Sequence, residues 1–187
     1  MRRSASRRSS NQLSTTGDLS RTKPTRTKNQ RSIFLSYSWD NPSHTDWVEK
    51  FAFRLKANGL DVIVDRWHLK LGDSIARFME AAIESSDFVL LICTPRYRLR
   101  ADQRSGGVGY EHDLMTARKI ASGDNARFIP ILRAGTWYTA TPKWIAGQLG
   151  VDLRGENYAE ESFQNLVDHL LKFPIRNTRP SIRRNRP

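Results

Sequence analysis

The chain has 187 residues, which allows one globular domain with a substantial core and is too short for two domains of ordinary size. It carries 31 Lys and Arg against 19 Asp and Glu, but nine of the basic residues lie in residues 1–31 and five in residues 176–187, so residues 32–175 hold about −1 of the formal +12. The isoelectric point of about 10.4 therefore describes the tails, and it does not indicate a folded domain that binds nucleic acid.

Residues 1–30 are predicted to be a disordered basic tail. They are rich in Ser, Thr and Arg and contain almost no large apolar residue, so they cannot bury enough surface to offset the entropy lost on ordering. Their composition resembles a transit peptide, but they have neither an apolar face nor the apolar run of a secretory signal. Residues 176–187 form a second basic tail. Both tails are suited to weak contact with nucleic acid or an anionic surface.

Residues 31–175 are expected to form the domain, and their first strand is SIFLSY, which ends at Ser36-Tyr37-Ser38. An amphipathic helix follows, opening at Ser43 and stopping at Gly59. LDVIVD is predicted as the second strand and RWHLKLGD as a polar loop. Helical periodicity returns over residues 75–83. DFVLLICT is predicted as a third strand that is covered on both faces, because it is apolar throughout.

In the second half of the domain, PRYRLRADQRSGGVG is predicted as a long arginine-bearing loop that leads into a helix containing Tyr110 and Leu114. ARFIPIL is predicted as the fourth strand, GVDLR as a candidate fifth and residues 163–171 as the closing helix. This alternation predicts an α/β fold, a doubly wound parallel sheet of four to five strands with helices on both faces. Ligands of such sheets bind beyond the carboxyl ends of the strands.

Several kinds of site are not predicted. No apolar run is long enough to span a membrane, so we expect a soluble, cytoplasmic protein. The single cysteine, Cys93, lies in the apolar run FVLLIC and is predicted to be a small buried residue. The four histidines have no metal-ligand spacing, so no metal is predicted. No GxxxxGK[ST] or GxGxxG motif is present, and GGVG follows a long loop where those motifs occupy a tight turn.

The residues at the strand ends have ordinary interpretations as well as functional ones. Glu111 stands in the first turn of its helix, where the dipole favours an acid by roughly 0.3–1 kcal/mol whatever its function. Trp67 and Leu69 either close the edge of the core or belong to a partner surface. The arginines after the third strand form either a solvated face or a phosphate cradle; they are Arg96, Arg98, Arg100 and Arg104.

Taken in order, IFLSYSWD, WVEKFAFRLKANGLDVIVDRW, LKLGD, FMEAAIESSDFVLLICTPRY, GGVGYE and FIPIL resemble the Toll/interleukin-1 receptor (TIR) superfamily. Within it they are most similar to the SEFIR-type branch, which occurs in bacteria and in animal receptors. The resemblance covers residues 32–175 and implies a flavodoxin-like fold. It also implies one of two functions, because many members are NAD glycohydrolases with a helix-borne catalytic glutamate, whereas others are scaffolds that signal by assembling with like domains.

The resemblance assigns roles to individual residues. It places the catalytic glutamate at Glu111. It implies contact with the nucleotide by the end of the first strand and by the loop after the second, which also contacts neighbouring protomers. Some active members have a basic residue where this chain has Ser38 and a tryptophan where it has Gly107, so Tyr110 or Tyr97 is expected to supply the aromatic wall. The expected NAD-binding residues are Ser36, Tyr37, Ser38, Asp40, Lys70, Gly72, Asp73, Tyr97 and Tyr110.

One carboxylate is sufficient for this reaction. Ordinary glycosidases use two, one of which protonates the leaving oxygen. The nicotinamide of NAD+ is a cationic pyridinium that departs as a neutral molecule, so it needs no proton. An ionised Glu111 would hydrogen-bond the ribose hydroxyls and stabilise the developing oxocarbenium charge. We therefore expect NAD+ to be a substrate, with no separate cofactor, and activity to depend on self-assembly.

Two other functions fit the same sequence. A non-enzymatic TIR or SEFIR adaptor would act in signal transduction or bacterial immunity through homotypic contacts of the loop from Trp67 to Asp73. Alternatively, the basic tails would anchor the domain to nucleic acid by contacts with phosphates.

Overall fold

The structure is a computed structural model that describes residues 30–103 and 127–172. Glu111 and Tyr110 lie outside the described residues, as do both tails and the predicted helix that follows GGVG. The described elements, in chain order, are β1 (Ser32–Ser36), α1 (Pro42–Ala57), β2 (Asp61–Ile63), α2 (Asp65–His68), α3 (Ile75–Ser85), β3 (Phe88–Cys93), α4 (Pro95–Asp102), β4 (Phe128–Leu132), α6 (Trp137–Ala140), the 3₁₀ turn η2 (Lys143–Ile145), β5 (Val151–Asp152) and α7 (Glu160–Lys172).

The five strands form one parallel sheet in the order β2-β1-β3-β4-β5. The chain first moves from β1 to β2 on one side and then crosses to β3 on the other side of β1, so its direction reverses between β1 and β3. In a doubly wound sheet this reversal opens a crevice at the carboxyl ends of the two strands. The predicted fold class is confirmed, and the candidate fifth strand is present as β5.

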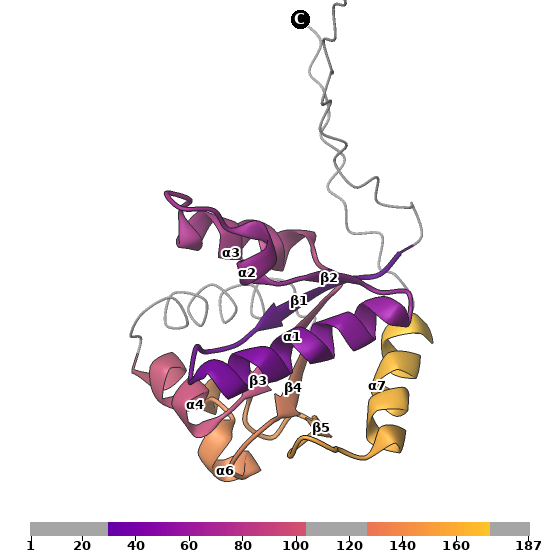
Figure 1. Ribbon diagram of the computed structural model, residues 1–187. Coiled ribbons are helices and arrows are strands. Elements are labelled where there is room, and N and C mark those ends of the chain that lie inside the picture. Colours follow the sequence, from indigo (N-terminus) through magenta and orange to yellow (C-terminus); the bar gives the residue numbers. More distant parts are fainter. Residues whose placement is uncertain (1–29, 104–126, 173–187) are drawn as a thin grey trace, which may run out of the picture.

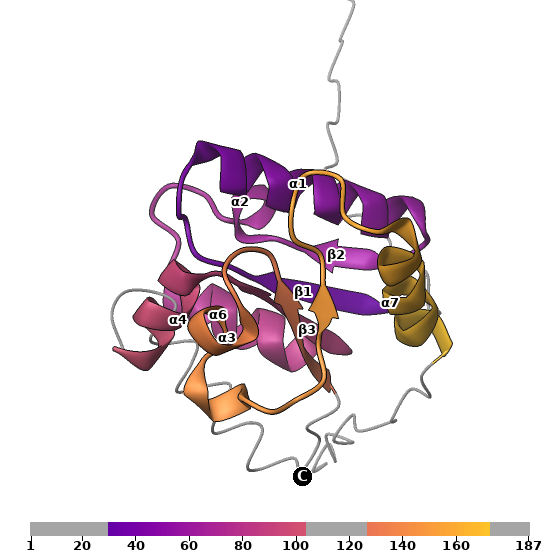
Figure 2. The ribbon, with the colours of Figure 1, turned by 90° about the horizontal axis from the view of Figure 1, so that it is seen from below.

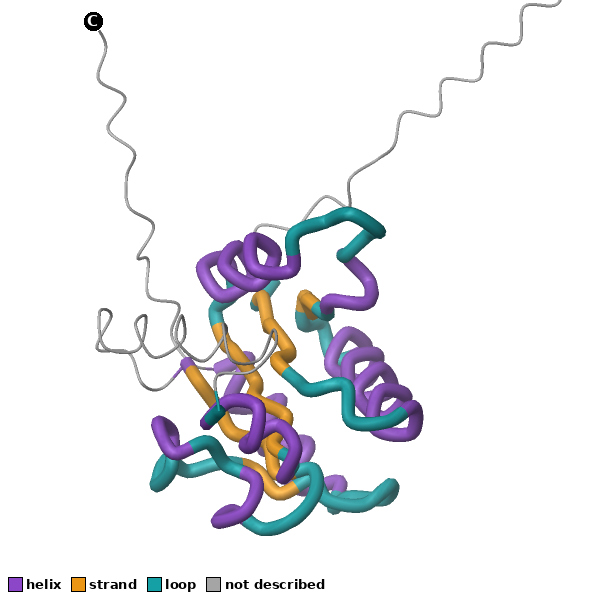
Figure 3. The backbone as a smooth tube through the Cα atoms, turned by 90° about the vertical axis from the view of Figure 1, so that its left-hand side faces the viewer, coloured by secondary structure: helices purple, strands orange, loops and turns teal. Residues whose placement is uncertain are grey.

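Helices cover both faces of the sheet (Figures 1 and 2). On one face, α1 and α7 pack on strand residues such as Leu35, Leu90 and Ile131. On the other face, α3, α4, α6 and η2 pack on the alternate residues, among them Phe34 and Leu91. The strands run side by side between the two helical layers in Figure 3. Burial on both faces explains why β1, β3 and β4 are apolar throughout.

Two predicted loops contain helices. RWHLKLGD was expected to be a loop, but its first residues belong to α2, which begins at Asp65. The arginine-bearing segment after β3 was also expected to be a loop, but Pro95–Asp102 is a helix. Its Thr94 side chain accepts a hydrogen bond from the backbone of Tyr97, and proline occupies its first turn, which together form a strong helix start. Four of the eight residues of α4 are charged and only Tyr97 and Ala101 are buried, so the sequence shows no clear helical pattern of apolar residues there.

The start of α1 also differs from the expected position. Ser43 was predicted to open this helix, but the cap is Asn41, whose side chain accepts a hydrogen bond of 2.8 Å from the backbone N–H of His44. Pro42 follows at the first helical position, where its missing N–H costs nothing. The helix therefore starts at Pro42, three residues after Trp39 and close to the end of β1.

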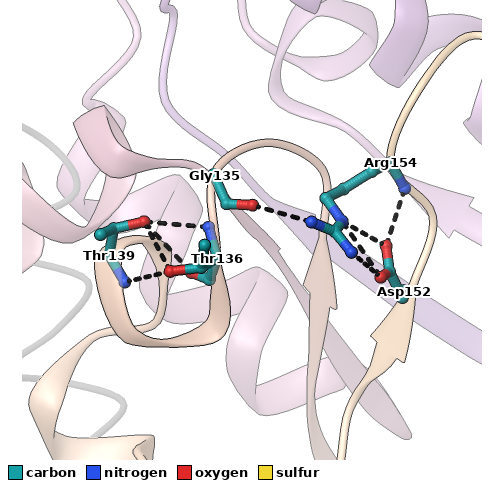
Figure 4. Close-up of polar contacts among 5 residues, drawn as sticks. All are labelled: Gly135, Thr136, Thr139, Asp152 and Arg154. Atoms are coloured by element: carbon teal, nitrogen blue, oxygen red, sulfur yellow. Dashed lines mark hydrogen bonds and ion pairs between the residues drawn. The ribbon is translucent and has the colours of Figure 1, made fainter.

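At the carboxyl ends of β4 and β5, polar groups form hydrogen bonds and an ion pair with one another (Figure 4). The Arg154 guanidinium binds the Asp152 carboxylate at 2.6 Å and the Gly135 carbonyl at 3.2 Å. Thr136 and Thr139 form a capping box at the start of α6. Gly135 has a φ of 79°, and a Cβ there would come within 2.8 Å of the Thr139 hydroxyl. The polar groups drawn at this end bind one another.

Candidate functional site

The end of β1 places three predicted site residues under the surface. Ser36, Tyr37 and Ser38 are all buried. The Ser36 hydroxyl shares a hydrogen bond of 2.9 Å with the Tyr97 hydroxyl, which comes from α4. Tyr97 is 2% exposed and belongs to the core, so in this conformation its ring offers no free face to a ligand. These contacts join the first turn of α4 to the end of β1.

Asp40 links the ends of the two strands that border the crevice. Its carboxylate accepts hydrogen bonds from the hydroxyl of Ser38 and, at 2.6 Å, from the hydroxyl of Thr94 at the end of β3. The backbone carbonyl of Asp40 accepts a further bond of 2.9 Å from Arg96. Thr94 also caps α4, so one hydroxyl serves both the helix start and the strand-end contact. Asp40 therefore holds β1, β3 and α4 together at the crevice.

Asp65 is a second carboxylate at this edge of the sheet, and it is only 5% exposed. It accepts hydrogen bonds from the Tyr37 hydroxyl at 2.7 Å, from the Trp39 indole N–H at 3.0 Å and from the backbone N–H of Arg66 at 2.7 Å. Burial, reinforced by the bond to Asp65, raises the pKa of Tyr37 far above its ordinary value, so the hydroxyl stays a donor. Asp65 thereby fixes both residues that flank Ser38.

Sequence reasoning identified Asp65 as a strand end and did not assign it this role. An acid directly after an apolar strand is a usable signal, but its partners lie 26 and 28 residues away. Thr94 was likewise placed at a strand end, in the stretch Thr94-Pro95-Arg96-Tyr97, and was given no role of its own. Its signal was the combination of a threonine, a strand end and the proline that follows it.

The loop after α2 holds the three other predicted contacts, Lys70, Gly72 and Asp73. The Asp73 carboxylate accepts a hydrogen bond of 2.8 Å from the backbone N–H of Lys70, and the Asp73 N–H donates to the Lys70 carbonyl at 3.0 Å. Gly72 has a φ of 90°, which allows this tight turn. Leu71, at the tip, is fully exposed. In the chain, α2 stands between this loop and the strand-end group, defined as Ser36, Ser38, Asp40, Thr94 and Tyr97.

Trp67, in α2, packs against the first helix. Its ring centroid lies 5.0 Å from that of Phe53, and its indole N–H donates to Glu49 at 3.1 Å. It also packs on the core layer beneath α1. The interpretation of Trp67 as a side chain that closes the core edge is therefore supported.

Two groups near the crevice have shifted acidities. Burial raises the pKa of the Cys93 thiol to about 12, so this cysteine is a buried thiol and not a nucleophile. Burial lowers the pKa of His44, with the nearby Asp40 opposing the shift and Arg133 adding to it. The His44 imidazole is consequently neutral near pH 7. Among the residues that the structure describes, no cluster of His, Cys, Asp and Glu is suited to hold a metal ion.

In the same described part of the chain, no helix is long and apolar enough to cross a membrane. The structure joins Ser36 to Tyr97 and Ser38 to Asp40 by direct hydrogen bonds, and Thr94 links Asp40 to the backbone of Tyr97. Tyr37 stands between Ser36 and Ser38 in the chain, but its hydroxyl binds Asp65. The structure places Lys70, Gly72 and Asp73 in a separate loop.

Comparison with known proteins identifies this architecture. Residues 33–167 match the sequence model of the TIR domain family. A crystal structure of a prokaryotic SEFIR domain is 31% identical, with a TM-score of 0.65, and the match covers 82% of this chain and 99% of that one. The TIR domain of the Toll-related receptor TRR-2 from Hydra magnipapillata is 16% identical with a TM-score of 0.51 over 74% of this chain and 96% of that one, which shows a shared fold.

A curated relative matches part of the chain. The NAD(+) hydrolase PdTIR of Paracoccus denitrificans (strain Pd 1222) is 32% identical over 65 residues. That match spans 35% of this chain and only 21% of the relative. The family match covers most of the described domain, and the sheet order agrees with it. The chain therefore belongs to the TIR domain family and lies close to its SEFIR-type members.

Proposed function

We propose that this protein is an NAD+ glycohydrolase that cleaves the bond between nicotinamide and ribose when its domains assemble. The observation that carries the proposal is the group of side chains at the β1/β3 crevice, where Asp40 and Thr94 join the two strand ends. A doubly wound sheet binds its ligands at this place. Membership in the TIR family and the partial match to a protein named an NAD(+) hydrolase support the same activity.

The proposed chemistry needs one carboxylate, that of Glu111. Ionised, it would bind the ribose hydroxyls next to the bond that breaks and stabilise positive charge on the sugar in the transition state. Nicotinamide departs as a neutral molecule, and water or the adenine of the same nucleotide captures the sugar. Cys93 takes no part, because a buried thiol of raised pKa supplies no thiolate.

The strand-end residues would act mainly by positioning. The hydroxyls of Ser36 and Tyr37 and the carboxylate of Asp40 already bind protein groups. They would therefore shape the crevice, while the Lys70–Asp73 loop, exposed along its length, would cover the nucleotide. We propose that a neighbouring protomer holds this loop over the nucleotide, and we therefore expect activity to depend on assembly.

The test is nicotinamide release from NAD+ by purified full-length protein over a hundredfold range of protein concentration. We expect the rate per protomer to rise with concentration, and a crowding agent to raise it further at a fixed concentration. Release should be followed by chromatography, so that nicotinamide is identified as a product. No release at the highest concentration with crowding, from folded protein, would contradict the proposal.

A second function, adaptor assembly without catalysis, is favoured by one observation. Leu71 is fully exposed at the tip of its loop. Phe53, which packs on Trp67 of α2, and Ile75, four residues after Leu71, are about half exposed. Large apolar side chains on a surface are characteristic of protein contacts. We propose that Leu71 contacts a second copy of the domain, whether or not NAD+ is cleaved.

Leu71→Asp should weaken self-association at least tenfold, because it places a charge in an apolar contact. Sedimentation velocity over a concentration series measures this directly. Leu149→Asp is the matched control, since Leu149 is 92% exposed in the loop before β5 and should have no effect. Equal association of wild type and Leu71→Asp would remove this loop from the interface. If Leu71→Asp abolishes association and wild type releases no nicotinamide, the adaptor function is the better one.

A further inference from the structure

We propose that Trp39 is a stacking platform for the planar heteroaromatic ring of a nucleotide. The proposal rests on the proposed function, which it deepens by naming a substrate-binding residue outside the predicted set. It starts from a hollow of about 400 Å³ beside the end of β1. Its lining residues come from the β1–α1 connection, the first turns of α1 and the start of α2; they are Trp39, Asn41, Pro42, Thr45, Asp46 and Arg66.

Trp39 is exposed and yet held in place. Its side chain is 57% exposed, but its indole N–H donates to the buried carboxylate of Asp65 at 3.0 Å. Asp65 is itself held by the Tyr37 hydroxyl and by the backbone of Arg66. A surface tryptophan normally loses rotamer freedom when a ligand binds it. Here part of that entropy has already been lost on folding, which favours binding.

The chemistry of the hollow fits a nucleotide base. A broad aromatic face stacks on any base, and stacking tolerates different rings because each has a π-face. One acidic and one basic residue, Asp46 and Arg66, are among the residues that line the hollow. The few polar groups of a ligand pocket fix the orientation of a ring that the apolar wall holds. Adenine and the pyridinium ring of nicotinamide are both planar heteroaromatic rings, so Trp39 could stack on either one. The experiment below determines which of the two rings it binds.

The position of the hollow supports this assignment. Trp39 lies between Ser38 and Asp40, both of which belong to the strand-end group at the β1/β3 crevice. A larger hollow of about 490 Å³ runs along β2, the outer strand of the sheet, and its lining extends from Leu60 before that strand to Ile63 at its end and His68 in α2. None of its lining residues comes from the end of β1 or of β3, where a doubly wound sheet of this order binds its ligands. The smaller hollow is thus the one suited to a substrate.

The test uses full-length protein, with AMP and nicotinamide mononucleotide as separate probes. Trp39 is identified among the indole N–H signals in ¹H–¹⁵N NMR spectra by its absence in Trp39→Phe. We expect one of the probes to shift this signal in a saturable way and to show upfield shifts of its own ring protons, as stacking on an indole requires. A response to AMP assigns the hollow to adenine, and a response to nicotinamide mononucleotide assigns it to the pyridinium.

Trp39→Ala should weaken binding of the responding probe at least about fivefold, whereas Phe53→Ala, which removes a comparably exposed ring from α1, should not. Saturable probe binding that leaves the Trp39 signal unmoved, no binding of either probe at millimolar concentration, or equal binding by wild type and Trp39→Ala would overturn the proposal. The ring-proton shifts are measured on wild type, so this result does not depend on how well a variant folds.

The outcomes separate this proposal from the proposed function. Probe stacking on Trp39 in a protein that releases no nicotinamide would leave the platform standing and remove the glycohydrolase. Nicotinamide release with the same KM in wild type and Trp39→Ala would leave the glycohydrolase standing and remove the platform.

Discussion

Glu111→Gln should lower nicotinamide release from NAD+ by at least about a hundredfold, because one preorganised electrostatic group at the reacting centre typically contributes that much. Glutamine has nearly the same shape and can still hydrogen-bond a ribose hydroxyl, but it carries no negative charge to stabilise the oxocarbenium-like sugar. The loss should appear in kcat, with KM for NAD+ little changed, since the charge acts mainly in the transition state. The measurement is a steady-state NAD+ titration at a protein concentration that supports assembly.

The matched control is Glu161→Gln. Glu161 stands in the first turn of α7, the kind of position that the sequence predicts for Glu111, and the helix dipole favours an acid there. Glu161 is exposed, and α7 follows β5, which is separated from β1 by two strands of the sheet. If Glu111 is an ordinary first-turn acid, both variants should behave like wild type. Equal rates for wild type and Glu111→Gln would therefore remove the catalytic assignment, while a loss in both variants would indicate an effect on assembly or folding. Sedimentation velocity on both variants separates these cases.

The fold was predictable from periodicity because the core is made of regular patterns. FVLLIC contains six consecutive buried residues, and such a run has few interpretations other than a strand covered on both faces. In α1, the buried residues Trp47, Val48 and Phe51 repeat with helical spacing. These signals are local in sequence and arise from the same burial that stabilises the sheet.

The short helices were missed because their stabilisation is not local. In α4, only Tyr97 and Ala101 are buried among eight residues, so periodicity gives almost no signal. Its strongest indications are the cap at Thr94 and the proline that follows. A four-residue helix such as α2 is too short for any periodic pattern, and it forms because Trp67 packs on α1.

The candidate site was predicted in part for a similar reason. The end of β1 could be located because carboxyl ends of parallel strands are known binding positions. The roles of Asp40 and Asp65 depend on partners 54 and 28 residues away, and no single-sequence pattern records which hydroxyl meets which carboxylate. The sequence therefore indicated which edge of the sheet to consider, and the structure was needed to show which polar groups there bind one another.

Asp65→Ala should lower the free energy of unfolding by about 2–4 kcal/mol, because it leaves the buried Tyr37 hydroxyl without its acceptor and releases the Trp39 indole and the Arg66 backbone N–H. Asp65→Asn should cost less, about 1–2 kcal/mol, since one oxygen still accepts from Tyr37 and Arg66 while the new amide group faces the Trp39 N–H. Urea unfolding at equilibrium measures both values.

The control and a double-mutant cycle decide whether the loss arises from these bonds. Asp168→Asn, which removes an exposed ion pair with Lys172 in α7, should change stability by less than about 0.5 kcal/mol. In a Tyr37→Phe background the orphaned hydroxyl no longer exists, so Asp65→Ala should cost at least about 1 kcal/mol less than it does in wild type. Additive effects of the two substitutions would mean that the Tyr37–Asp65 bond does not stabilise the domain. Coupling of at least about 1 kcal/mol would establish that the buried Asp65 carboxylate stabilises the end of β1 through Tyr37. Trp39, which Asp65 also binds, and the serines of the strand-end group lie in this segment.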